Sequence, residues 1–180
     1  MASVTKLLNA LPLGTMEQKL FETLMASATT VPVPLVEVFE TDATNITPIT
    51  NATGPKRDSA NGDTDSGIVI TWVASNSDAV IFQTNIPSHV EAGDIATVKV
   101  RIKAGGSTDT PTLAADLYIN EGDTKVEYTT AAVSAAYQEL SIPIGGSNMP
   151  VNPRTLTCEI TPGAHTTDTL VISAIWVEFS

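Results

Sequence analysis

The sequence predicts an all-β protein, an antiparallel β-sandwich of the jelly-roll kind, preceded by a short N-terminal helical arm. Short apolar or alternating runs recur from residue 68 to residue 179, with turn residues between them, as in sandwiches and barrels. Only 16% of the residues are charged, so Thr, Ser and Asn supply much of the polarity. These side chains suit strand surfaces and turns better than helix interiors. A length of 180 residues is enough for one domain with its own core.

The predicted arm occupies residues 1–30, and the predicted sandwich occupies residues 31–180. Thr15 is a suitable N-cap for a helix over residues 16–28, with Glu17 in its first turn. One side of this helix is apolar, at the spacing of a single helical face. It either covers an open end of the sandwich or docks on a partner subunit. The apolar positions are Met16, Leu20, Phe21, Leu24 and Met25.

The sandwich is predicted to begin with an extended, proline-rich joint over residues 31–34, because neither proline can continue a helix. Residues 35–39 follow as a first strand. Residues 41–67 are mostly Thr, Asn, Asp, Gly and Pro without periodicity, which predicts a long polar surface loop.

After residue 67 the predicted strands follow one another at short intervals. The clearest is 95–103, where apolar and polar residues alternate as in a half-buried strand and Gly105-Gly106 ends the run. Residues 113–130 read as a hairpin around the turn 120–123. The expected strands are 68–74, 79–83, 95–103, 113–119, 126–130, 137–142, 155–161 and 170–179.

The last strand, 170–179, is apolar on both sides, which is typical of a central strand or of one pressed against another subunit. With strict alternation, Leu170, Ile172, Ala174 and Trp176 share one face. We therefore expect the other face and the helical stripe to supply a partner interface. Those residues are Leu20, Phe21, Leu24, Met25, Val171, Ile175, Val177 and Phe179. The predicted core is Trp72, Val98, Val100, Ile102, Leu117, Leu156, Cys158, Ile160, Ile172 and Trp176.

The charge balance excludes two classes of partner. Twenty Asp and Glu against nine Lys and Arg give a net charge of −11, without a basic cluster. Such a chain repels phosphate backbones and anionic membrane surfaces, so neither nucleic acid nor membrane is an expected partner. No apolar run approaches the roughly 18 residues of a membrane span. With one cysteine the chain forms no internal disulfide, and we expect synthesis in a cytoplasm.

Catalytic and metal-binding motifs are weak throughout. Cys158 and His165 are candidates for a nucleophile–base pair, but Cys158 shares one strand face with Leu156 and Ile160, which predicts a buried, inert thiol. His89 lies far from both, and no G-x-S-x-G motif occurs. Asp63 and Asp65 resemble a calcium loop, yet no Glu closes it at the EF-hand distance. The acidic tip 120–123 is equally typical of a turn. We therefore expect the protein not to be an enzyme and to bind neither a cofactor nor a metal ion.

The chain from residue 82 to residue 180 resembles small jelly-roll proteins of tailed phages, notably head decoration, or cement, proteins. The resemblance lies in residues 83–94 before the strand 98–102, then 137–140, 152–156, 161–165 and the closing strand 169–179. It implies a structural virion protein that binds the major capsid protein and stabilises the shell surface, commonly as a trimer. It implies no catalytic residue.

A second class of function is kept beside this one. Similar sandwiches occur in carbohydrate-binding modules and phage fibres, so fold analogy alone does not choose between them. Trp72, Trp176 and the three tyrosines would form a sugar-stacking platform if exposed, whereas burial would make them core residues. Hydrolase activity is the third and least supported hypothesis.

Overall fold

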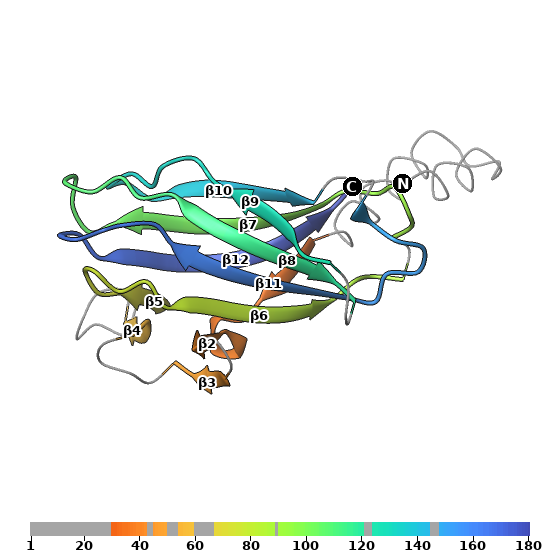
Figure 1. Cartoon of the computed structure of the whole chain (residues 1–180), viewed down its shortest axis with the longest axis horizontal. Coiled ribbons are helices and arrows are strands. Elements are labelled where there is room, and N and C mark those ends of the chain that lie inside the picture. Colours follow the sequence, from red (N-terminus) through yellow and green to blue (C-terminus); the bar gives the residue numbers. More distant parts are fainter. Residues whose placement is uncertain are drawn as a thin grey trace, which may run out of the picture.

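The computed structural model describes residues 30–42, 45–49, 54–59, 67–88, 90–120, 124–144 and 148–180. Two antiparallel sheets face each other as a β-sandwich (Figure 1), which confirms the predicted fold class. The predicted helical arm, apart from Thr30, lies outside the described residues. Sheet A contains, in order, β10 (Gln138–Ile144), β7 (Ala96–Ala104), β12 (Leu170–Phe179), β5 (Ile68–Trp72) and β4 (Lys56–Ser59), with β1 (Thr30–Val33) also on β12. Sheet B contains β3 (Asn45–Pro48), β2 (Phe39–Asp42), β6 (Ala79–Asn85), β11 (Thr155–Pro162), β8 (Leu113–Ile119) and β9 (Val126–Thr129).

Strand β12 is the centre of sheet A. One of its edges pairs with β7 along nearly its whole length. Its other edge is shared by two shorter strands, because β5 pairs with residues 170–172 and β1 with residues 175–178. The apolar composition of β12 on both sides therefore belongs to a central strand, the first of the two readings of this segment.

The ladder between β12 and β7 contains an irregularity at Ser173. The register shifts between Ile172 and Ala174, so one extra residue of β12 stands opposite β7. Such a bulge reverses the facing of every later residue, because side chains in a strand alternate with a period of two. Leu170 and Ile172 point into the sandwich before the bulge, and Ile175, Val177 and Phe179 point into it afterwards.

The core lies between the two sheets and is built mainly from their inward-facing aliphatic side chains. Nine of the ten predicted core residues are buried: Trp72, Val98, Val100, Ile102, Leu117, Leu156, Cys158, Ile160 and Ile172. The prediction for Trp176 is wrong, because the bulge turns its side chain to the outer face of sheet A, where it is half-buried. Trp72 is fully buried, and its indole Nε1 donates to the carbonyl of Asp78 at 2.8 Å.

The start of the sandwich differs from the predicted joint and strand. Residues predicted as a joint form β1, where Pro32 is tolerated because β1 lies at a sheet edge. Residues predicted as one strand form a 3-10 turn, η1 (Leu35–Glu37), followed by β2. The Arg57 guanidinium donates to the carbonyls of Leu35, Val36 and Val38 at 3.2, 2.8 and 2.6 Å. A cation 19 to 22 residues away thus stabilises the turn, and local sequence gives no sign of it.

The loop predicted over residues 41–67 is also corrected. This segment contains the end of β2 and all of β3 and β4. Strand β4 carries Lys56, Arg57 and Asp58, so it lacks an apolar alternation that would reveal it. Both β3 and β4 are short edge strands, and edge strands need no two-sided burial.

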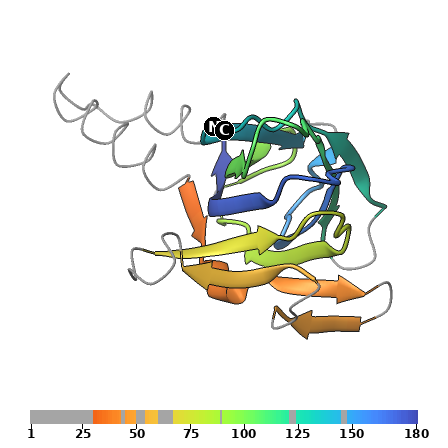
Figure 2. The same ribbon diagram turned by 90° about the vertical axis from the view of Figure 1, so that its left-hand side faces the viewer.

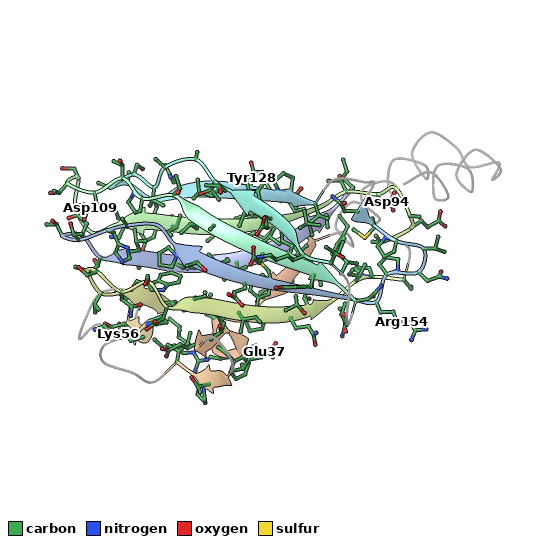
Figure 3. The ribbon with its side chains drawn as sticks, viewed as in Figure 1. Glu37, Lys56, Asp94, Asp109, Tyr128 and Arg154 are labelled. Atoms are coloured by element: carbon green, nitrogen blue, oxygen red, sulfur yellow. The ribbon has the colours of Figure 1, made fainter. Side chains whose placement is uncertain are left out.

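Two loops at one end of the sandwich are held together by a pair of aspartates (Figure 3). The Asp168 carboxylate accepts from the backbone N–H groups of Thr108 and Asp109 at 2.7 and 2.8 Å. The Asp109 carboxylate accepts in return from Thr167 and Asp168 at 2.7 and 2.8 Å. Four backbone donors of otherwise irregular loops are thereby satisfied.

No helix in the described part of the chain is long and apolar enough to cross a membrane.

Candidate functional site

The outer face of sheet B, which is turned toward the viewer in Figure 1, carries polar side chains in ordered rows. Which side chains lie on this face follows from the alternation along β11 and from its pairing with β6 and β8. Residues 155, 157, 159 and 161 of β11 point outward, because the intervening Leu156, Cys158 and Ile160 are buried. Their partners on β6 and β8 point the same way, so polar side chains from three strands line up across the sheet.

One such row consists of Gln83, Thr157 and Tyr118. Gln83 lies opposite Thr157, and Thr157 lies opposite Tyr118. The Gln83 amide Nε2 donates to the Thr157 hydroxyl at 3.0 Å, which fixes the orientation of the amide group. An amide, a hydroxyl and a phenol are thereby placed side by side, a set that donates and accepts hydrogen bonds.

The neighbouring row is acidic. Glu159 lies opposite Ile81 on one side and opposite Asp116 on the other, and Asp116 lies opposite Glu127. The Lys125 ammonium contacts Asp116 at 2.9 Å and Glu127 at 2.8 Å. These two carboxylates raise the pKa of Lys125, Glu127 first and Asp116 second. Lys125 is therefore held in its charged form.

Glu159 differs electrostatically from its neighbours in this row. Partial burial raises its pKa, the Asp116 carboxylate raises it further, and Lys125 opposes the change. By contrast, the hydrogen bond from Lys125 lowers the pKa of Glu127. One carboxyl group of the row thus resists ionisation while another favours it. The row lies on the open outer face of the sheet.

A hollow of about 430 Å³ adjoins these rows on the side of the sheet where β2 and β3 lie. Phe39, 38% exposed, and Ile46, 64% exposed, form its apolar side. Figure 2 shows the β2–β3 hairpin that carries them standing at one edge of the sandwich, and Figure 3 places Glu37 beside that hairpin. The lining residues are Glu37, Phe39, Ile46, Ile81, Phe82, Gln83 and Thr157.

The structure does not bring the predicted interface together. Ile175, Val177 and Phe179 are buried within the sandwich, at 3%, 0% and 2% exposure, so their assignment to a partner-facing surface is wrong. The bulge at Ser173 is the reason. Val171 lies on the outer face of sheet A, half-buried. The arm residues Leu20, Phe21, Leu24 and Met25 lie outside the described residues.

Cys158 and His165, the two residues considered for catalysis, are both buried in the sandwich. Cys158 is fully buried, and burial, followed by the nearby Asp116 and Glu159 carboxylates, raises the pKa of its thiol. His165 is 2% exposed, with Nδ1 2.8 Å from the Gly163 carbonyl oxygen and Nε2 3.2 Å from that of Val73. It therefore ties two loops together.

The calcium hypothesis concerned residues that the structure does not describe, since Asp63, Asp65 and Asp123 lie outside its described ranges, as does His89. Within those ranges no three His, Cys, Asp or Glu side chains form a group able to hold a metal ion.

Sequence reasoning identified the outward positions of β8 and β11 but not the site they form. Because Leu117, Cys158 and Ile160 were predicted to be buried, alternation turns their neighbours Asp116, Tyr118 and Glu159 outward. Joining them into rows requires the register between strands about 40 residues apart in sequence. Phe39 was missed because it was assigned to a different strand.

No protein-family model and no curated protein sequence matches the chain. Solved structures do match. One is the Clostridium thermocellum xylanase 10B fragment with CBM22-1 and GH10 modules, complexed with xylohexaose (15% identity, TM-score 0.51). The match covers 83% of this chain and 28% of that one, so this chain spans well under half of its neighbour. Another is the xylan-binding module CBM15 (13% identity, TM-score 0.50), where the match covers 84% of this chain and 96% of the module. These matches agree on the jelly-roll sandwich fold.

Proposed function

We propose that this protein is a non-catalytic carbohydrate-binding module whose ligand lies across the outer face of sheet B. The observation that carries the proposal is the combination, on one face, of a partly apolar hollow with adjoining polar rows. A pyranose ring has an apolar C–H face and a rim of hydroxyl groups. Apolar and aromatic side chains bind the first, and amide, hydroxyl and carboxylate groups bind the second.

In this arrangement Phe39 and Ile81 contact the ring face of one sugar in the hollow. Gln83 and Thr157 reach its hydroxyl groups, and Tyr118 contacts the next sugar toward β8. Glu159 and Asp116 accept hydrogen bonds from hydroxyls along the adjacent row. The two structural neighbours support the ligand class, since one is complexed with xylohexaose and the other is a xylan-binding module.

The proposal is tested by isothermal titration calorimetry with neutral oligosaccharides, xylohexaose first, after a glycan array has ranked the candidates. Tyr118→Ala and Gln83→Ala should each weaken binding by roughly tenfold, because each removes about 1–2 kcal/mol of contact. Tyr128→Ala is the matched control, since Tyr128 is an exposed aromatic at the β9 edge and outside the rows (Figure 3). Absence of binding to every neutral glycan on the array would reject the proposal.

Capsid decoration stays a proposal that rests on the sequence resemblance of residues 82–180. It places the chain on a virion surface, bound to a major capsid protein. Co-sedimentation of the purified chain with phage heads, together with a negative glycan array, would favour it over glycan binding. Failure to co-sediment together with glycan binding would exclude it.

A further inference from the structure

One strand on the outer face of sheet A, β7, carries a row of cations, opposite in sign to the net charge of the chain. Lys99, Arg101 and Lys103 point outward at every second position of β7, because the intervening Val100 and Ile102 are buried. Consecutive side chains on one face of a strand are about 6.7 Å apart. The result is a straight row of three cations in a protein of net charge −11.

Two of these cations converge on a single aromatic ring. The Arg101 guanidinium carbon lies 5.0 Å from the centroid of Tyr137, and the Lys103 ammonium lies 4.7 Å from it. Within the described ranges neither cation forms an ion pair with a carboxylate. Lys99 differs, since it contacts Glu139 at 2.8 Å and Glu178 at 3.8 Å. Both cations keep their charge beside this ring, so a carboxylate that approaches the ring's surroundings is attracted by each of them.

A row of less polar side chains runs beside the cations on β12. Trp176 lies opposite Lys99, Ala174 opposite Arg101 and Val171 opposite Lys103. Trp176 is half-buried, and its indole Nε1 donates to the Glu178 carboxylate at 2.9 Å, which holds the ring in place. Pro32 of β1 lies opposite Trp176 on its other side. The face therefore pairs a cationic row with a parallel apolar row.

We propose that this outer face of sheet A is a binding face for an extended, carboxylate-bearing polysaccharide. Arg101 and Lys103 bind the acid group of one sugar, and Trp176 contacts the ring of another. Two parallel rows suit a linear polymer whose acid groups project to one side better than a globular acidic partner. A nucleic acid fits poorly, because only two of the cations lack a carboxylate partner on this face and the rest of the chain is acidic.

This site is distinct from the neutral-glycan site on sheet B and does not depend on it. Polygalacturonate and the same polymer with its carboxyl groups reduced are the two probes, compared by affinity gel electrophoresis and calorimetry. Polygalacturonate should bind and its reduced form should not. Binding should weaken when sodium chloride is raised from about 0.05 to about 0.5 M, because exposed charges are then screened. Equal binding of the two polymers would overturn the proposal, as would tighter binding of a single-stranded oligonucleotide.

Variants locate the site. Arg101→Gln should weaken polygalacturonate binding by about tenfold or more, and Arg101→Gln with Lys103→Gln should abolish it. Arg154→Gln is the matched control, because it removes the same charge from an exposed arginine in the loop before β11. Loss of binding in Arg154→Gln to the same extent would mean that net charge, not this face, decides affinity.

Tryptophan fluorescence provides a readout of position. Trp72 is fully buried, so acrylamide quenches chiefly Trp176, which lies on the proposed face. Polygalacturonate should protect Trp176 from quenching, whereas a neutral oligosaccharide bound to sheet B should leave quenching unchanged. Tyr118→Ala should not alter the protection. An unprotected Trp176 in the polygalacturonate complex would overturn the proposal even where binding itself is observed.

Discussion

At the scale of single residues, Glu159 is a carboxyl group whose pKa is shifted upward, whereas the pKa values of Asp58, Asp109 and Glu127 are lowered. Partial burial and the Asp116 carboxylate raise its pKa above the ordinary value of 4.5. The native state then holds this proton more tightly than the unfolded state does. The free energy of unfolding therefore falls as the pH rises from 4.5 through the raised pKa. A carboxylate kept here therefore lowers stability at neutral pH.

Replacing Glu159 by Gln should remove this pH dependence. We expect Glu159→Gln to be more stable than the native protein at neutral pH by up to about 0.5 kcal/mol. The difference should vanish below pH 4.5, where the native carboxyl group is protonated. Urea denaturation across the pH range measures it. Glu127→Gln is the control with opposite sign, since the Lys125 hydrogen bond lowers the pKa of Glu127. A destabilised Glu159→Gln at neutral pH would contradict the assignment.

Asp168 is a second residue with a measurable role, because one carboxylate oxygen satisfies two loop N–H groups. Asp168→Ala leaves the donors of Thr108 and Asp109 without this partner and should cost about 1–3 kcal/mol of unfolding free energy. Asp168→Asn keeps an acceptor oxygen and should recover part of that loss. Thermal and urea unfolding of both variants provide the measurement. Equal stability of Asp168→Ala and the native protein would show that water replaces the carboxylate at no cost.

At the scale of elements, β12 shows where sequence reasoning succeeds and where it ends. Its existence and its two ends were predicted from apolar content alone, with the correct span of residues 170–179. Which side faces inward was predicted correctly only before Ser173. A bulge adds a residue without any signature in a run of apolar side chains, so strict alternation inverts the rest of the strand. The ladders of β7 with β10 and of β8 with β11 are regular, and the facing of β7, β8 and β11 was predicted correctly.

The elements missed by sequence reasoning share a cause. Strands β1, β3 and β4 lie at sheet edges, where one-sided pairing and partial exposure relax the need for apolar alternation. Each is recognisable only from its partner strand. The candidate site on sheet B depends on the same kind of information, because its rows exist only through the register of β6, β11 and β8.

The bulge makes a direct prediction for β12. Ile175→Ala should cost about 2–5 kcal/mol, because it leaves a cavity in the core. Val171→Ala should cost less than about 1 kcal/mol, because Val171 lies on the outer face. Strict alternation would give both residues the same sensitivity, since it places them on the same face. Urea unfolding midpoints of the two variants distinguish the alternatives. Equal losses of stability in the two variants would contradict the bulge.

At the scale of the whole molecule, the burial of Ile175, Val177 and Phe179 changes what a homotrimer would require. These side chains occupy the sandwich core. The part of β12 that a partner could contact is therefore its outer face, where Val171 lies. A trimer stays a prediction from the sequence. Its apolar contacts would have to come largely from the stripe of Leu20, Phe21, Leu24 and Met25.

A shortened chain beginning at Thr30 tests this division. We expect it to fold, because β1 is retained, and to have the mass of a monomer in light scattering at micromolar concentration. The full chain is the comparison. A trimer formed by the shortened chain would show that the sandwich itself carries the interface. If the full chain and the shortened chain are both monomers, the predicted trimer is wrong.

The position of β12 also bears on how the protein is made. Among the described strands β12 comes last in chain order, yet this strand joins β7 to β5 and β1 in the middle of sheet A. Until residues 170–179 emerge, β7 and β5 have no common neighbour, and the inner face of sheet B has no complete sheet to cover it. Sheet A is therefore completed only after β12 has been made, since long-range pairing cannot precede the strand that it requires. A message cut short before codon 170 would yield a chain with a well-formed hairpin at β8–β9 but an open, aggregation-prone sandwich.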